Sequence, residues 1–215
     1  MKGGSGPWKQ EPFNEVIASR ICSRLAIPCV DYSLIFEGKR PFSLCENFIT
    51  QETELIPAWR IFQTQSRPVK RSLFDHFIIC CEGLCFSGAK DALDRMLTLD
   101  FIIANEDRHW HNFGLVRNAE TLEITGFAPL YDSGSSLWYN SDLSVVGSCT
   151  RSKPFCMSHD EQILLVSDFD WFDREALEGL EDEIISILSS SADVNADRSA
   201  AIATAVMARC ACHMG

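Results

Sequence analysis

The sequence predicts an α+β protein with a small strand-containing N-terminal part, residues 1–50, and a larger, mainly helical part, residues 51–215. Three observations predict this class. Apolar and polar residues alternate mainly within residues 29–49, and apolar residues at helical spacing dominate after residue 54. A composition of 46% hydrophobic and 23% charged residues is that of a folded chain, and 215 residues are enough to bury a sizeable core.

The N-terminal part is expected to hold one helix and one β-hairpin. Residues 14–26 place Val16, Ile17 and Ile21 at helical spacing, with Asn14 as a suitable N-cap and Pro28 as a stop. Residues 29–36 alternate in polarity, and the Glu-Gly-Lys-Arg sequence at 37–40 is typical of a turn into a second extended stretch at 41–49.

Helical spacing predicts most elements of the C-terminal part. The expected helices are residues 55–62, 72–86, 89–104, 160–166, 170–180, 184–188 and 195–212. A polar loop at 105–112 and a second hairpin, with strands at 113–116 and 121–124, interrupt them. A cleft between two such parts is a common ligand site.

The charge balance excludes several classes of partner. Acidic residues outnumber basic residues 30 to 19, for a net charge of −11. A surface so negative repels phosphate backbones and anionic lipids, so no direct nucleic-acid contact is expected. No apolar run approaches the roughly 18 residues of a membrane helix, and the first seven residues lack the hydrophobic stretch of a secretion signal. We therefore expect a cytoplasmic protein without membrane contact.

The ten cysteines are expected to be reduced thiols, mostly buried. The chain is longer than a small disulfide-stapled scaffold, and no C-x-x-C pair is present to begin a zinc site.

The densest polar cluster lies at residues 105–112 and points to phosphoryl transfer. Asp107 and Asn112 are five residues apart, and Asp132 begins an Asp-Ser-Gly sequence beyond the second hairpin. Phosphoryl transfer needs a carboxylate that orients the acceptor hydroxyl and two oxygen ligands that hold magnesium against nucleotide phosphates. The alternative is that these are ordinary turn residues. The order of apolar helix, loop, hairpin and aspartate favours the catalytic interpretation.

Two stretches of the chain resemble the HipA-like serine/threonine kinases. They are LDFIIANEDRHWHNFGLV at residues 99–116 and APLYDSGSS at residues 128–136, and the resemblance also takes in QEPFNE at residues 10–15. It implies a protein-kinase-like, two-lobed fold, with residues 1–50 as a truncated N-lobe and residues 51–215 as the C-lobe. It also implies phosphorylation of serine or threonine with ATP and Mg²⁺.

The resemblance implies a role for each residue that matches the family's motifs. Asp107 would be the catalytic base, Asn112 and Asp132 the magnesium ligands, Lys2 the lysine that meets the nucleotide phosphates, and Glu15 the acid that orients Lys2. These roles agree with the chemistry, because a lysine is a point charge suited to phosphates.

Further residues receive roles from the same resemblance. Glu46, Asn47 and Phe48 lie in a stretch that looks like the hinge, whose backbone would receive adenine. His109 matches the family's Asp-Arg-His sequence and would fix the loop by a hydrogen bond beside Asp107. Arg108 and Asp100 are expected to brace that loop.

Several residues keep a second interpretation. Lys2 would otherwise be a frayed terminal lysine, and Glu15 a first-turn acid favoured by the helix dipole. Residues 3–6, Gly-Gly-Ser-Gly, either offer backbone N–H groups to phosphate or form a flexible linker.

The sequence departs from the kinase pattern at its start. A kinase-type site needs a glycine-rich phosphate loop before the lysine, whereas here that lysine is residue two. The resemblance therefore leaves open a catalytically weak pseudokinase or interaction module. Kinases of this family often act as toxins paired with an antitoxin, which implies a protein substrate and an antitoxin or regulatory partner.

A metal-dependent phosphohydrolase is a third interpretation. It would use His109, His111 and the His159-Asp160 pair. These residues do not form a coherent ligand set in the sequence, and His159-Asp160 is better explained as the start of a helix.

Overall fold

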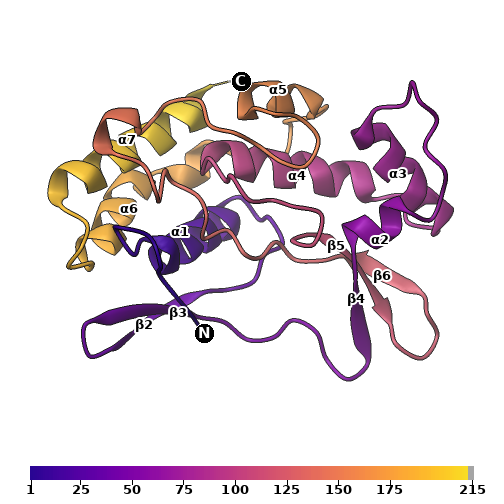
Figure 1. Ribbon diagram of the computed structural model, residues 1–215, viewed down its shortest axis with the longest axis horizontal. Coiled ribbons are helices and arrows are strands. Elements are labelled where there is room, and N and C mark those ends of the chain that lie inside the picture. Colours follow the sequence, from indigo (N-terminus) through magenta and orange to yellow (C-terminus); the bar gives the residue numbers. More distant parts are fainter. Residues whose placement is uncertain (213–215) are drawn as a thin grey trace.

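The computed structural model describes residues 1–212 and has the α+β architecture that the sequence predicts (Figure 1). Two three-stranded antiparallel sheets lie on one side of a body of helices (Figure 1). The first sheet has the order β1-β3-β2 and the second the order β4-β5-β6. The strands are β1 (Lys2–Gly3), β2 (Ser33–Glu37), β3 (Arg40–Leu44), β4 (Thr53–Pro57), β5 (Gly114–Asn118) and β6 (Ile124–Phe127).

The helices cover most of the remaining described chain. They are α1 (Glu11–Arg24), α2 (Ala58–Phe62), α3 (Leu73–Gly83), α4 (Ala89–Ile102), α5 (His159–Gln162), α6 (Leu180–Ser189) and α7 (Ala196–Ala211). Short 3₁₀ turns are η1 (Leu143–Val145), η2 (Ile163–Leu165) and η3 (Glu175–Leu177). The side chains of Ser72 and Asn195 cap the N-termini of α3 and α7, and serine and asparagine are preferred at this position.

The first predicted helix and hairpin are confirmed, with shifted ends. Helix α1 begins at Glu11, because Pro12 suits the first turn of a helix. Asn14 is therefore inside the helix and buried, and the prediction that it is the N-cap is wrong. The hairpin pairs β2 with β3 from Ser33↔Leu44 to Glu37↔Arg40. Residues 45–49 lie beyond the end of β3 rather than in a strand.

Two predicted helices are corrected by tertiary structure. Residues 53–57 form β4, which pairs with β5 so closely that a Cβ on Gly114 would lie 2.1 Å from the carbonyl oxygen of Ile56. Of residues 170–180, only the η3 turn and Leu180, the first residue of α6, are helical, and Gly179 with its left-handed φ of 77° separates η3 from α6. The aromatic residues Trp171 and Phe172 pack against the core instead.

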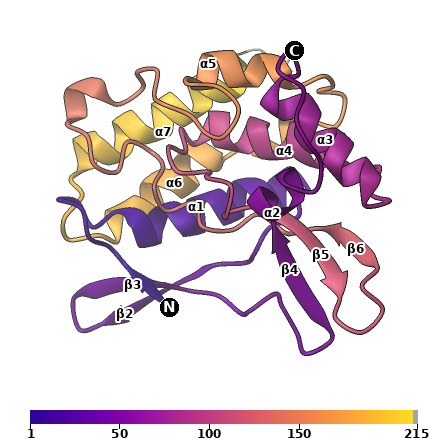
Figure 2. The same ribbon diagram turned by 45° about the vertical axis from the view of Figure 1, so that its right-hand side comes forward.

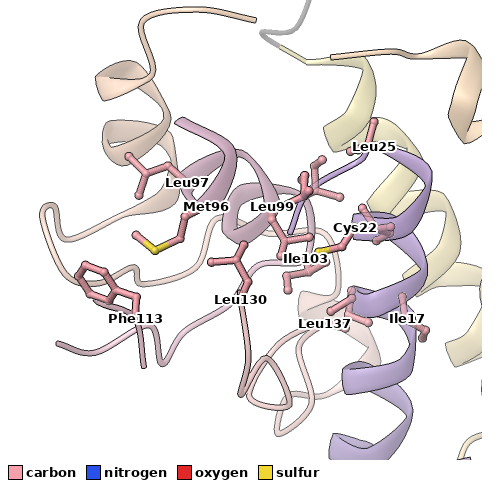
Figure 3. Packing of buried hydrophobic residues seen from close by; sticks show 14 of the residues in the cluster. Ile17, Cys22, Leu25, Met96, Leu97, Leu99, Ile103, Phe113, Leu130 and Leu137 are labelled. Atoms are coloured by element: carbon pink, nitrogen blue, oxygen red, sulfur yellow. The ribbon is translucent and has the colours of Figure 1, made fainter. Parts of the chain in front are cut away.

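A single hydrophobic cluster joins α1 to the helical body. Figure 3 shows Ile17 and Cys22 of α1 beside Leu99 and Ile103 at the end of α4, and beside Leu137. Figure 2 shows α1 lying between the β2–β3 hairpin and α6. Helix α1 therefore connects the first sheet to the end of α4, where the polar loop starts. Within residues 1–212, no helix is long and apolar enough to cross a membrane.

Candidate functional site

A buried ion pair fixes the polar loop to the end of α4. The guanidinium of Arg108 contacts the carboxylate of Asp100 through Nη2–Oδ1 at 2.9 Å and Nε–Oδ2 at 3.0 Å. Both side chains are 0% exposed. Burial works to lower the pKa of Arg108, but the carboxylate of Asp100 outweighs it and raises that pKa. Asn105 adds a hydrogen bond from Nδ2 to Asp100 Oδ1 at 2.8 Å.

The same arginine joins the loop to the segment that carries Asp132. Its Nη1 donates to the backbone carbonyls of Asn112 at 3.2 Å and Tyr131 at 2.6 Å, and its Nη2 donates to Ser133 Oγ at 3.1 Å. Asp132 lies between Tyr131 and Ser133 in the sequence and has a left-handed φ of 55°. Arg108 thus brings the backbones on both sides of the proposed metal site together.

Hydrogen bonds within the loop orient its polar side chains. The Asp107 N–H donates to Asn105 Oδ1 at 3.1 Å, and Asn112 Nδ2 donates to the backbone carbonyl of Asp107 at 3.1 Å. The amide oxygen of Asn112 is then the atom left to meet a ligand. His109 Nδ1 accepts the N–H of His111 at 3.2 Å, which is a loop-fixing contact.

Lys2 is held by two acids rather than frayed. Strand β1 places Lys2 opposite Ser43, and its ammonium contacts Asp132 Oδ1 and, at 3.4 Å, Glu15 Oε1. Glu15 Oε2 accepts the Ser133 N–H at 2.8 Å. Burial works to lower the pKa of Lys2, but the two carboxylates outweigh it and raise that pKa. Burial also raises the pKa of Glu15, although Lys2 and the Ser133 N–H act to lower it.

The Gly-Gly-Ser-Gly segment turns its polar groups toward α1. The Ser5 N–H and hydroxyl and the Gly6 N–H all donate to Glu11 Oε1, at 2.9, 2.8 and 3.1 Å. Burial works to raise the pKa of Glu11, but these hydrogen bonds outweigh it and lower that pKa. These donors reach phosphate only if Glu11 is displaced.

The proposed hinge residues line two adjoining cavities. Glu46, Asn47 and Phe48 border one cavity of about 710 Å³ and another of about 290 Å³. The smaller one also includes Tyr32 and Tyr131. The Asp132 N–H donates to the Tyr32 hydroxyl at 3.4 Å, so one of the residues that line the smaller cavity contacts Asp132.

Two features of the site have no counterpart in the sequence-based predictions. Lys153 Nζ lies 2.7 Å from Asp107 Oδ1, although the two residues are 46 positions apart. Asn14 Nδ2 donates to the carbonyls of Gly134 at 2.8 Å and Ser136 at 2.7 Å. The only signal for Lys153 was a basic pair, Arg151 and Lys153, in an acidic chain. Asn14 was predicted only as an N-cap and as part of the QEPFNE stretch, because its partners lie 120 and 122 residues away.

The histidines do not form a metal centre in the described part of the chain. No group of three or more His, Cys, Asp or Glu side chains within residues 1–212 is placed to hold a metal ion. His159 is 1% exposed, and burial lowers its pKa to about 4. A phosphohydrolase built on these histidines is therefore not supported.

The fold that carries Lys2, Glu15 and the braced loop is similar to those of solved proteins. Among solved structures, the chain is similar to the Helicobacter pylori proinflammatory kinase CtkA, with a TM-score of 0.66 at 17% identity, covering 93% of this chain and 82% of that one. It is also similar to a chain of the HipA, HipB and operator DNA complex of Shewanella oneidensis MR-1, with a TM-score of 0.52 at 13% identity, covering 92% of this chain and 54% of that one.

The fold likeness confirms the HipA-like resemblance that the sequence predicted. No protein-family model and no curated protein matches the sequence. At these identities the likeness establishes the fold, and the activity has to be argued from the site.

Proposed function

We propose that this chain is an ATP- and Mg²⁺-dependent phosphotransferase that phosphorylates serine or threonine in a protein. The observation that carries the proposal is the way Arg108 joins the loop of Asp107 and Asn112 to the segment of Asp132. Lys2, which comes from β1, completes the group through its contact with Asp132. Phosphoryl transfer depends on this kind of positioning and electrostatic stabilisation rather than on covalent catalysis.

The residues present fit a magnesium ion and a nucleotide. Asn112 offers an amide oxygen and Asp132 a carboxylate, and hard oxygen ligands are those that Mg²⁺ prefers. When bound, the metal would neutralise charge on the nucleotide phosphates. Lys2 would exchange its contact with Asp132 for one with these phosphates. Its contact with Glu15 would remain and hold Lys2 in place.

Asp107 would act on the acceptor hydroxyl. In the transfer, the hydroxyl oxygen bonds to the γ-phosphorus, the bond from that phosphorus to the bridging oxygen breaks, and the hydroxyl proton passes to the Asp107 carboxylate. ADP is the leaving group. The backbone of Glu46, Asn47 and Phe48 would receive the adenine in the adjoining cavity.

A pseudokinase or interaction module is the second candidate. It is favoured by Glu11, which occupies the N–H groups of Ser5 and Gly6 that phosphate would otherwise use. The similar HipA chain was solved with HipB and operator DNA, so we propose a regulatory protein partner of the antitoxin kind and a cytoplasmic location. The net charge of −11 argues against direct contact of this chain with DNA.

Nucleotide binding separates the two candidates. Mg-ATP at ten times its Kd should stabilise the chain by about 1.4 kcal/mol, which is a rise in melting temperature of about 4 °C. ATP with a chelator should give a smaller rise. No change at millimolar Mg-ATP would support the interaction module.

Substitution of Asp132 tests the metal assignment. Asp132→Asn should reduce Mg²⁺-dependent transfer of labelled phosphate to casein or to the chain itself about 100-fold, because a neutral amide holds the cation poorly. The matched control is Asp193→Asn, since Asp193 is also an aspartate paired with a lysine, but its partner is Lys9 and not Lys2 or Lys153. Equal activity of the two variants would contradict the assignment.

A further inference from the structure

Lys153 forms an ion pair with Asp107, and the proposed mechanism gives this ion pair no role. Its Nζ is 2.7 Å from Asp107 Oδ1, and the two side chains are 49% and 42% exposed. Asp132, the other acid proposed to act in the reaction, also has a lysine partner, Lys2. Each of the two reactive carboxylates is thus paired with an ammonium from a distant part of the chain.

The segment that carries Lys153 is fixed in place. Gln162 of α5 is 1% exposed, and its Nε2 donates to the Lys153 carbonyl at 2.8 Å. Its Oε1 accepts the N–H groups of Phe155 at 3.1 Å and Cys156 at 3.4 Å. One buried amide therefore holds the backbone of residues 153–156.

Phe155 anchors the same segment to the catalytic loop. Its ring packs edge-on against Trp110, at 5.4 Å between ring centroids, and against Phe113 at 6.3 Å. Trp110 belongs to the loop at residues 105–112, and Phe113 directly follows it. The lysine and the aspartate are therefore set against each other by packing from both sides, not by the weak attraction of two exposed charges alone.

Local charge explains why a cation is needed here. Glu106 and Asp107 are adjacent acids in a chain of net charge −11, and the transferred phosphate is itself an anion. Like charges at such close range repel, and a cation placed at the developing charge lowers the barrier to transfer. Lys153 is the ammonium in contact with Asp107.

We infer that Lys153 is a positioning residue of the phosphotransfer site: it holds Asp107 by Oδ1, leaves Oδ2 for the acceptor hydroxyl and places a positive charge beside the transferred phosphate. The inference rests on the proposed function. The proton of the hydroxyl passes to Asp107 Oδ2, and Lys153 keeps its own protons throughout.

The first test compares two exposed lysine–aspartate pairs. Lys153→Met should lower phosphate transfer from Mg-ATP to casein or to the chain itself about 10-fold, less than the loss of a buried donor because Lys153 is half exposed. Lys153→Arg should restore most of the rate. Lys9→Met is the matched control, since Lys9 pairs with Asp193 at 3.1 Å with exposures of 51% and 35%, and it should leave the rate unchanged.

The second test needs no nucleotide and no activity. In chain labelled with ¹³Cγ-aspartate, the Asp107 resonance is identified by its loss in Asp107→Asn. Lys153→Met should move that resonance, and Lys9→Met should not. Equal melting temperatures of the two methionine variants would show that both fold.

The outcomes separate the two proposals. An active wild type whose Lys153→Met variant keeps full activity overturns the role of Lys153 and leaves the proposed function standing. An Asp107 resonance that does not respond to Lys153→Met also overturns it. A wild type that transfers no phosphate overturns the proposed function, and the resonance then decides whether Lys153 positions Asp107.

Discussion

The two ion pairs of the loop at residues 105–112 differ in burial. Asp100 and Arg108 are 0% exposed, and Arg108 also donates to the carbonyls of Asn112 and Tyr131, whereas Lys153 and Asp107 are 49% and 42% exposed. A buried pair leaves an uncompensated charge when one partner is removed, and an exposed pair is screened by water. The first pair therefore supports the structure of the loop, whereas the second contributes little to the stability of the fold.

The largest expected effect is the loss of the buried arginine. Arg108→Met should lower the free energy of unfolding by about 4 kcal/mol, because Asp100 is left buried without its partner. Denaturant titration measures this. The double variant Arg108→Met with Asp100→Leu should recover part of the loss, since no unpaired charge remains. If Arg108→Met lowered the free energy of unfolding by less than about 1 kcal/mol, the buried pair would contribute no more than an exposed one.

A pH-dependent loss of stability is expected from the buried side chain of His159. Burial lowers the pKa of His159 from 6.5 to about 4, so the unfolded chain binds a proton that the folded chain does not. The stabilising contribution is present above pH 6.5 and is lost as the pH falls toward 4, by up to about 3 kcal/mol. Urea titrations at pH 7 and pH 5 should therefore differ less in His159→Gln than in the wild type.

An intermediate effect is expected at Asn14, which links α1 to the segment after Asp132. Asn14→Ala removes two donors to buried carbonyls, of Gly134 and Ser136, and should cost about 2 kcal/mol in the free energy of unfolding. Asn14→Asp is the sharper variant, because a carboxylate cannot donate to a carbonyl. An unchanged midpoint in both variants would mean that water replaces these contacts.

The smallest effect on stability should be that of Lys153→Met. An exposed pair contributes on the order of 0.5 kcal/mol, so denaturant titration should hardly distinguish this variant from Lys9→Met. A loss as large as that expected for Arg108→Met would show that the exposed pair supports the structure as well. The two pairs would then not differ in their contribution to stability.

The site could be predicted from the sequence where its residues are close together along the chain. The five-residue spacing of Asp107 and Asn112 and the Asp-Ser-Gly sequence at Asp132 identified the loop and the segment that Arg108 joins. The proposed roles of these residues remain to be tested by the variants above. Lys153 and Asn14 escaped prediction, because their contacts span 46 and 120 residues.

The sequence by itself determined the α+β class, the β2–β3 hairpin and the resemblance to HipA-like kinases. These depend on local spacing and on short motifs. Tertiary structure decided that residues 53–57 form a strand and that Lys2 is held by Glu15 and Asp132. Tertiary structure also brings the ammonium of Lys153 into contact with the carboxylate of Asp107. A strand pairing or an ion pair depends on the residue opposite, and only folding brings that residue within reach.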